Sequence, residues 1–356
     1  METIVKIIKW SVGIDVGAKS VRCCLSSINS SQSVKVKASR KVNNTAAGLQ
    51  ELLLWIQKHY KEGEAPLSIA MEATGVYYER CALLLQKEGF RVSVVLPTKA
   101  KRYLQAIGLK SKNDKIDAEG LARMGAEQQL AEWSAASAQM YGLRLLTRQH
   151  EDLQKSITSF NNQLHAISHG MYRFEDIEKT YQQTLSALTQ LLKQVEDAIS
   201  ESVKANEVLK QKVELLCSIK GVGELTAATI IAETNGFALF ENQKQLESFS
   251  GYDVIENQSG DHVGRTKISK KGNSHIRRIL HMAALNAVTY KVKPFVDLYE
   301  RVYPKTNIKM KGYVAVQRKL LVMLYTLYKK NEKFDPGYKP KTIGEKELEP
   351  SFGLAL

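Results

Sequence analysis

Two short apolar runs in the first third of the chain each end on a carboxylate, and this pattern constrains the fold more than any other feature. Asp15 ends the run in SVGIDVGAKS, and Glu72 ends the run in LSIAMEATG. Each run is typical of a buried strand, and an unpartnered Glu72 in such a place would carry a large desolvation cost. A further pair, Asp114 and Asp117, lies three residues apart at a predicted helix start, so that both carboxylates project from one face.

Carboxylates gathered from two strand ends and a helix repel one another strongly unless cations lie between them. Such a group is the usual protein part of a two-metal phosphoryl-transfer site, so the sequence predicts bound Mg²⁺, with Mn²⁺ as the other candidate. Structural roles are the alternative for single members: Asp15 could cap a turn, and Asp114 could begin a helix.

The segments around these acids predict a layered α/β domain. The expected elements are strands at 12–16, 21–26 and 33–38, a helix capped by Thr45, a strand at 67–71, a helix at 78–87, a strand at 92–96 and a helix at 100–107. This order matches a ribonuclease-H-like topology, in which Asp15 lies on the central first strand and Glu72 at the end of the fourth.

A heptad pattern follows this domain. Apolar residues alternate in steps of four and three from Leu146 to Met171, and the pattern returns from Leu185 to Ile199. Such spacing predicts coiled-coil packing, either as an antiparallel hairpin that breaks near 170–176 or as a seam between subunits. We favour a helical pair that also contacts a partner subunit, with plain intradomain helices as the alternative. His150 falls on a core position and is expected to be buried in the seam.

The positive charge of the chain is concentrated near its C-terminal end. The net charge is +14, and residues 259–330 hold 16 Lys or Arg against three acids, a balance of +13. A segment of this kind predicts a surface that binds a polyanion such as nucleic acid. The expected phosphate contacts are the basic residues of one loop and the helix after it: Arg265, Lys267, Lys270, Lys271, Arg277 and Arg278.

Two further motifs in this region point to phosphate chemistry. Gly221 and Gly223 lie between two apolar helical stretches, a helix-hairpin-helix pattern whose backbone N–H groups can bind a DNA phosphate. Ser259 precedes a glycine in a polar loop rich in cations, where a hydroxyl could attack phosphorus. From the residues alone an ordinary loop serine is the simpler interpretation, and Ser269 and Ser274 compete with it on equal terms.

Cysteine spacing and hydropathy indicate the compartment. The four cysteines lack metal-ligand spacing, which favours free thiols in a reducing environment. No apolar run is long enough to cross a membrane, and the N-terminus lacks a signal-peptide pattern. We therefore expect a cytoplasmic protein with no membrane partner.

Taken in order, these motifs resemble those of the DEDD-type insertion-sequence transposases, the group related to the Piv DNA invertase and described as bridge-RNA-guided recombinases. The N-terminal marks are GIDVGAKS, AMEATGVYYE and KNDKIDAEGLA. The C-terminal marks are IKGVGELTAATIIAE, LESFSGY, the QSG loop and ISKKGNSHIRRIL. They occur in the family's order and approximate spacing over nearly the whole chain.

The resemblance implies an α/β domain followed by helical ones. Its segments are a RuvC-like, ribonuclease-H-like catalytic domain at 1–138, a coiled coil at 139–206, a mainly helical transposase domain with the helix-hairpin-helix at 207–334, and a tail at 335–356. It places the acidic tetrad on Asp15, Glu72, Asp114 and Asp117, and the nucleophilic serine on Ser259.

The mechanism that the resemblance implies is attack by Ser259 on a DNA phosphate, assisted by Mg²⁺ at the tetrad. It also implies donor and target DNA, a noncoding bridge RNA as guide, and a homo-oligomer, either a dimer or a tetramer. The serine and the carboxylates come from different domains, so the site could be assembled between subunits.

Three other classes of function fit parts of the sequence. A metal-dependent nuclease or Holliday-junction resolvase would share the carboxylates and need no serine, and a covalent protein–DNA intermediate would exclude it. An ATP-binding protein of the actin and sugar-kinase type would share GIDVGAKSVRCCL, and ATP hydrolysis would identify it. A non-catalytic nucleic-acid-binding protein would explain the charge but leaves Glu72, Asp114 and Asp117 without a role.

Overall fold

The computed structural model describes residues 6–60, 65–108, 113–255, 258–259, 262–264 and 266–337. The chain divides into two compact units, Met1–Ala135 and Ala136–Leu356. Most of the tail expected at 335–356 lies outside the described residues.

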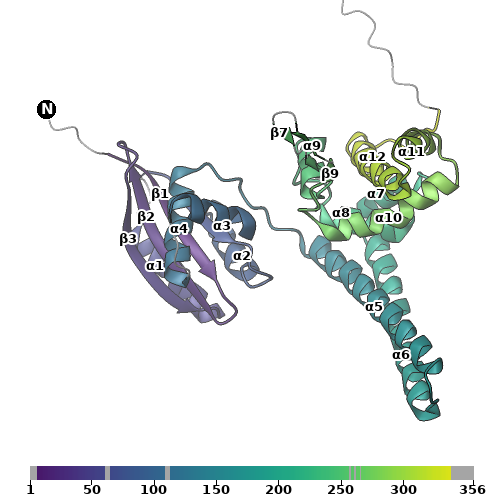
Figure 1. The fold of residues 1–356 in the computed structure, drawn as a ribbon. Helices are drawn as coiled ribbons and strands as arrows, with labels where there is room; N and C mark the ends of the chain where they lie inside the picture. Colours follow the sequence, from purple (N-terminus) through teal and green to yellow (C-terminus); the bar gives the residue numbers. More distant parts are fainter. Residues whose placement is uncertain are drawn as a thin grey trace, which may run out of the picture. The chain divides into compact units, whose positions relative to one another are not determined.

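The first unit is built on a mixed sheet (Figure 1). Within the described residues it has five strands in the order β3-β2-β1-β4-β5. β1 (Ile7–Val16) pairs antiparallel with β2 (Ser20–Asn29), which pairs antiparallel with β3 (Val34–Asn43). On its other side β1 pairs parallel with β4 (Leu67–Glu72), which pairs parallel with β5 (Val92–Val95). This order and these directions confirm the ribonuclease-H-like fold that the sequence predicts.

Helices cover both faces of this sheet. On one face the apolar side chains of α1 (Ala46–His59) and α2 (Glu79–Lys87) pack on β1, and Thr45 caps α1 as the sequence predicts. On the other face lie α3 (Pro97–Ala106) and α4 (Asp114–Glu127). α3 begins at Pro97, three residues before the helix start that the sequence predicts, and the missing N–H of proline costs nothing at a first helical position.

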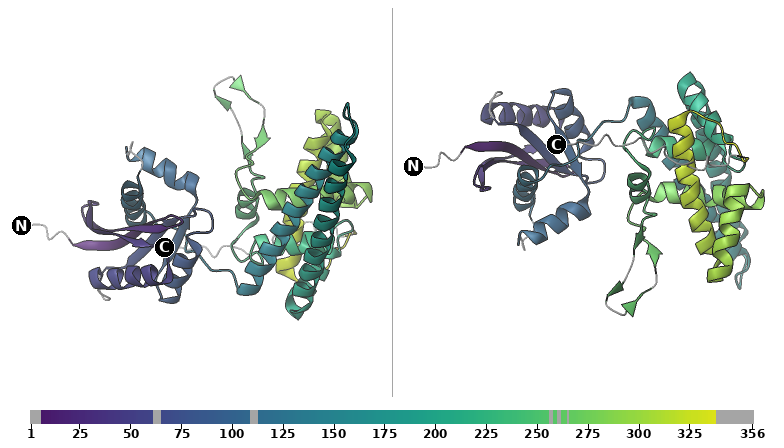
Figure 2. Two further views of the ribbon diagram at one scale, coloured as in Figure 1. Left: turned by 90° about the horizontal axis from the view of Figure 1, so that it is seen from below. Right: turned by 90° about the horizontal axis from the view of Figure 1, so that it is seen from above.

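Two long helices open the second unit. α5 (Ala138–Ser168) and α6 (Glu175–Lys204) pack side by side, and the chain turns between them at 169–174 (Figure 2). His150 has a side chain only 13% exposed and bonds Glu196 of α6 at 3.0 Å, so it lies between the helices. The structure therefore contains the helical hairpin, and its contact with a partner subunit stays a prediction.

Shorter helices complete this unit around one apolar core, in which Phe237, Tyr252 and Phe295 are fully buried. They are α7 (Glu207–Cys217), α8 (Glu224–Glu233), α9 (Gln243–Phe249), α10 (Ser274–Thr289), α11 (Lys293–Thr306) and α12 (Lys309–Lys330). All four cysteines of the chain are free thiols.

The segment between α9 and α10 is a β-ribbon where the sequence predicted a polar loop. β6 (Val254–Ile255) pairs antiparallel with β9 (Lys267–Ile268), and β7 (Gln258–Ser259) pairs antiparallel with β8 (His262–Val263). β7 and β8 stand away from the helices of their unit (Figure 2), whereas Ile268 of β9 packs against the core of those helices. Two residues per strand are too few for a period-2 pattern to be recognised in a sequence.

Candidate functional site

Asp15 and Glu72 lie at the carboxyl ends of adjacent parallel strands, as the last residue but one of β1 and the last residue of β4. The last paired residues of β1 and β4 are Ile14 and Met71, so Asp15 and Glu72 are the next residues on each strand. Neighbouring strands lie about 4.8 Å apart, which puts these two backbones side by side at the carboxyl end of the sheet. The structure thus brings together two carboxylates that are 57 positions apart in the sequence.

Helix α4 brings Asp117 to the same end. A Cβ on Gly13 would lie 2.7 Å from the Cα of Ala122 and closer still to Ala122 N and Ala118 O, so α4 crosses β1 where β1 has no side chain. A Cβ on Gly125 would meet Ser11, which shows that the helix runs back along β1 toward the residue after Gly13. The first turn of α4 therefore points toward the end of β1.

The four acidic residues differ in exposure. Asp15 and Glu72 lie on the α4 side of the sheet, because Gly13 and Ala70, two residues before each, face that helix. Asp15, Glu72 and Asp117 are half-buried, whereas Asp114 is exposed at the start of α4. Asn113 caps this helix, with its Oδ1 accepting from Ile116 N at 2.9 Å.

The donor chemistry of this group suits a hard divalent cation, because carboxylate oxygens are the ligands such ions prefer. Asp15, Glu72 and Asp117 each have an interaction partner in the protein. Within the described residues, no three His, Cys, Asp or Glu side chains are close enough together to hold a metal ion. The structure places the carboxylates at one end and on one face of the sheet without closing them into a coordination shell.

Sequence reasoning missed a cation beside this group. Arg22 on β2 is the register partner of Asp15 and is half-buried. The sequence of the β1–β2 hairpin could have shown this cation. The short turn at 17–19 sets the register of the two strands, and that register places residue 22 opposite residue 15.

In the second unit, Ser259 lies on β7 and pairs with His262 of β8. Its backbone therefore belongs to the β-ribbon, and the described residues say nothing of its side chain. Arg265 lies outside the described residues. Of the competing serines, Ser269 donates its hydroxyl hydrogen bond to Asp253 Oδ1 at 2.5 Å, and Ser274 is exposed at the start of α10.

The base of the β-ribbon is held by a buried carboxylate that the sequence did not reveal. Glu233 of α8 is 3% exposed and accepts two hydrogen bonds from Arg148 of α5, at 2.6 and 2.8 Å. It also accepts from Asn273 Nδ2 at 2.6 Å, and Asn273 Oδ1 in turn caps α10 by accepting from Ile276 N. Burial alone would raise the pKa of Glu233, but the hydrogen bonds from Arg148 and Asn273 and the charge of Arg148 lower it below its usual value.

A second carboxylate fixes the start of α10. Glu151 of α5 accepts from His275 Nδ1 at 2.6 Å and from Arg278 Nη1 at 3.2 Å. Beside it, the Nη1 of Arg277 donates to the backbone carbonyls of Ser250 at 2.9 Å, Gly272 at 3.2 Å and Asn273 at 3.3 Å.

The predicted phosphate contacts therefore fall into two groups. Lys267, Lys270 and Lys271 are exposed on the ribbon and its base. Arg277 and Arg278 already have partners within the protein, and their contact with phosphate stays a prediction.

The glycine turn at 221–223 joins α7 to α8. Gly221 has a φ of +105°, which a glycine adopts readily, and a Cβ there would meet Asn286 and Ala287 of α10. Gly223 is the N-cap of α8, and nothing lies within 4 Å of a Cβ built on it. Gly221 thus packs the turn on α10, and Gly223 remains open at the start of α8. The first N–H groups of that helix lack acceptors within the helix.

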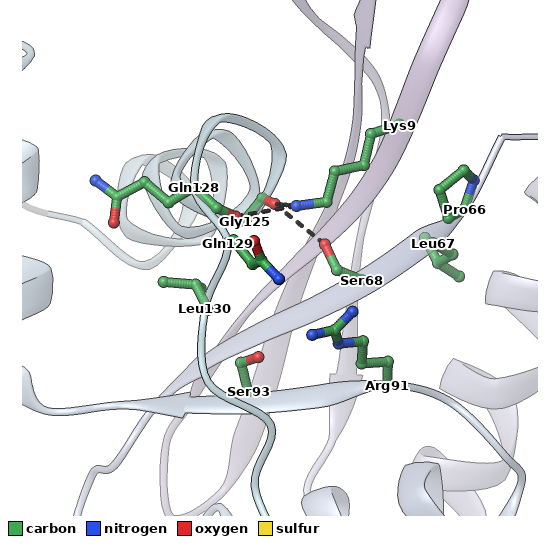
Figure 3. Close-up of a pocket in the computed structure, with 10 residues that line it drawn as sticks. All are labelled: Lys9, Pro66, Leu67, Ser68, Arg91, Ser93, Gly125, Gln128, Gln129 and Leu130. Atoms are coloured by element: carbon green, nitrogen blue, oxygen red, sulfur yellow. Dashed lines mark hydrogen bonds between the residues drawn. The ribbon is translucent and has the colours of Figure 1, made fainter. Parts of the chain in front are cut away.

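A cavity of about 100 Å³ lies in the first unit, but at the other end of the sheet from the carboxylates (Figure 3). It opens beside the first residues of β4 and β5, where Lys9 donates to the carbonyls of Gly125 and Gln128 at the end of α4. Burial, and after it the charge of Arg91, lowers the pKa of Lys9 below its usual value. Lys9 thus caps a helix, and this cavity is not the acidic site.

Two family models match the chain. Residues 12–173 match a model described as a transposase, the DEDD transposase of the IS110 group, and residues 213–300 match one described as transposase IS116/IS110/IS902 family. No helix of the described residues is long and apolar enough to cross a membrane.

Full-length relatives carry related names. The chain is 26% identical, over 92% of its length and 98% of the relative, to the pilin gene-inverting protein of Moraxella bovis. It is 24% identical, over 70% of its length and 74% of the relative, to the transposase for insertion sequence element IS1111A of Coxiella burnetii. A solved structure of T. thermophilus RuvC in complex with a Holliday junction substrate overlaps 33% of this chain and 93% of that chain, at 13% identity and a TM-score of 0.27. At that score the overlap adds nothing to what the strand order shows.

Proposed function

The chain belongs to the IS110 family of transposases and is a DNA transposase or recombinase; from this we propose that it cleaves and exchanges DNA strands through a serine nucleophile, assisted by a divalent metal ion. The observation that carries this proposal is the meeting of Asp15 and Glu72 at the ends of β1 and β4, with the first turn of α4 directed toward them. The family's other element, the serine, is Ser259 in the basic C-terminal segment.

In the proposed reaction the Oγ of Ser259 attacks a phosphodiester. The Oγ–P bond forms while the bond from phosphorus to one deoxyribose oxygen breaks, and that oxygen leaves as a hydroxyl with the proton that the serine gives up. A deoxyribose hydroxyl of the exchanged strand then attacks the phosphoserine and returns the serine. One phosphoester replaces another in each step, so strand exchange needs no external energy source.

The residues that would hold the metal are Asp15, Glu72 and Asp117, with Asp114 at the exposed end of α4. Mg²⁺ is the ion proposed, and Mn²⁺ suits the same oxygen ligands. A bound divalent ion would neutralise the phosphate and stabilise the charge that develops on its oxygens. Lys267, Lys270 and Lys271, being exposed, are the proposed contacts of the ribbon with DNA phosphates, joined by Arg265, Arg277, Arg278 and the glycine turn of Gly221 and Gly223.

The remaining parts of the proposal follow from the family. The catalytic domain is proposed at 1–138, the coiled coil at 139–206, the transposase domain at 207–334 and a tail at 335–356. The partners proposed are donor and target DNA, a noncoding bridge RNA and further copies of this chain, in a dimer or tetramer. The prokaryotic cytosol or nucleoid, where such DNA lies, is the proposed compartment.

Covalent trapping tests the serine chemistry. The protein, Mg²⁺, RNA transcribed from the element's flanking region, and labelled donor and target DNA are incubated, and label is sought on the denatured protein. We expect an adduct with wild type and with the matched control Ser274→Ala, and none with Ser259→Ala or Asp15→Asn. Cleaved DNA with no adduct, unchanged in Ser259→Ala, would make the protein a water-using nuclease. Adduct formation that is equal without RNA would remove the guide from the proposal.

A further inference from the structure

A row of charged residues crosses the sheet at the height of the carboxylates. Glu72 is the last residue of β4, and Asp15 is the last but one of β1. Arg22 is the register partner of Asp15 on β2, and Lys41 is the register partner of Arg22 on β3. Four adjacent strands thus carry two acids followed by two bases. Residues aligned in this way on neighbouring strands point to the same side of a sheet.

The row lies on the side of the sheet that α4 covers. Cys24, two residues after Arg22 on the same strand, packs in one buried cluster with Ala118 and Ala122 of α4. Side chains two apart on a strand share a face, so Arg22 lies on the same face as Cys24, and Asp15 does so as well. Arg22 is half-buried there, and Lys41 is exposed on the edge strand.

Arg22 has an unsatisfied donor in this position. In the part of the chain that the structure describes, its Nε is buried and has no hydrogen-bond partner. Buried N–H groups of proteins are nearly always paired, and a guanidinium offers only donors, in a planar fork that matches the oxygens of a phosphate. A phosphate that meets the guanidinium would supply an acceptor for this donor once the side chain turns toward it.

We propose that one DNA strand runs along this row, with the reacting phosphate at Asp15 and Glu72 and the next phosphates on Arg22 and Lys41. From Asp15 to Lys41 the row spans two strand spacings, about 10 Å. The proposal rests on the proposed function and adds to it the direction in which the DNA leaves the acidic site.

A structural role is the competing explanation of Arg22, since its charge lies beside two carboxylates and eases their repulsion. That role requires no contact with DNA. It also gives no reason for Lys41, which is exposed and farther from the acids. The dependence of DNA binding on salt separates the two explanations, because it counts the phosphates that the protein neutralises.

The experiment measures the affinity of the full chain for a short fluorescent DNA duplex across a series of salt concentrations, in EDTA. The variants are Arg22→Gln, Lys41→Gln and the double variant. Arg22→Lys retains the charge, and Lys35→Gln is the matched control: Lys35 is exposed on the same strand as Lys41 but pairs with Ser27, whose side chain points to the opposite face.

Each lost phosphate contact lowers the slope of log K against log salt concentration by about 0.9. We expect that drop for Arg22→Gln and for Lys41→Gln, about twice the drop for the double variant, and the wild-type slope for Arg22→Lys and Lys35→Gln. Wild-type slopes in both single variants would overturn the proposal, as would the same drop in Lys35→Gln, or a drop seen with RNA but not with DNA.

The covalent trapping assay keeps this proposal distinct from the proposed function. A lowered slope together with no adduct in wild type leaves the DNA path standing and removes the serine chemistry. If the slope is unchanged in the variants and wild type forms the adduct, the serine chemistry stands and the DNA path is removed.

Discussion

Replacing Gly13 by alanine tests the close approach of α4 to β1 on which the acidic site depends. A Cβ at this position would lie 2.7 Å from the Cα of Ala122 and closer to two other backbone atoms of α4, whereas ordinary contact begins at 3.4 Å. The Cα alone would have to move by about 0.7 Å to reach ordinary contact, and the two closer backbone atoms require a larger movement of the helix. Backbone atoms cannot rotate out of the way as a side chain can.

Overpacking of this kind costs about 1–3 kcal/mol and occasionally more, and we expect the upper end because the obstacle is a helix backbone. The same shift would draw Asp117 away from Asp15. Gly13→Ala should thus lower the free energy of unfolding of the first unit by about 3 kcal/mol and reduce the covalent adduct with DNA.

The tryptophans make this measurement specific. Trp10, Trp55 and Trp133 are the three tryptophans of the chain, and all belong to the first unit. Urea unfolding followed by tryptophan fluorescence therefore reports that unit alone. Gly142→Ala is the control, since its Cβ meets nothing within 4 Å and lies in the second unit. If Gly13→Ala leaves the fluorescence transition within about 0.5 kcal/mol of wild type, the packing argument is wrong.

Three further outcomes are expected. Glu233→Gln should lower the unfolding free energy of the second unit, measured by circular dichroism, by about 2 kcal/mol. Breaking a fully buried pair costs about 3–5 kcal/mol, but the side chain of Arg148 is 41% exposed. The control is Glu196→Gln, which removes an exposed carboxylate and should change the unfolding free energy by under about 1 kcal/mol. The pKa of Glu233 in the folded protein lies below its usual value of 4.5. The stability that its carboxylate contributes is therefore complete above about pH 4.5 and is lost as the pH falls through the folded-state pKa. Below pH 4.5 the unfolding free energy should thus fall more steeply with decreasing pH in wild type than in Glu233→Gln. Gly272→Ala, whose Cβ would lie 2.5 Å from Gly251 N, should destabilise the second unit by about 3 kcal/mol and suppress the DNA adduct, whereas an adduct at wild-type level would show that the ribbon base tolerates the shift. Lys9→Met should cost about 1–2 kcal/mol in the fluorescence transition, because the carbonyl of Gln128 loses its side-chain donor and that of Gly125 keeps only the Ser68 hydroxyl.

The sequence predicted the features that depend on local pattern. Apolar runs ending at Asp15 and Glu72 identify strand ends, and the order of strands and helices identifies the layered fold, because both follow from the period and length of each element. The cap at Thr45 follows from one residue and the helix after it.

The features it could not predict depend on pairings across the chain. Arg148 and Glu233 are 85 positions apart, and neither flanking segment shows that a buried carboxylate meets an arginine there. Arg277 has the composition of a phosphate contact, yet its guanidinium donates to three backbone carbonyls, a use that only the folded turn reveals. The β-ribbon was not predicted because its strands are too short to show the two-residue alternation of apolar and polar residues.

Helix α5 is bonded to α8 through Arg148 and to α10 through Glu151, and it extends well beyond these two contacts. Glu151 of α5 is bonded to His275 and Arg278 of α10, and the end of α5 at Ser168 lies 17 residues farther along. At 1.5 Å per residue this makes an arm of about 25 Å, so a displacement of about 4 Å at the tip corresponds to a rotation of about 10° at the fastening. A partner bound at the tip would therefore exert its force on the start of α10 and, through Asn273, on the base of the ribbon that carries Ser259.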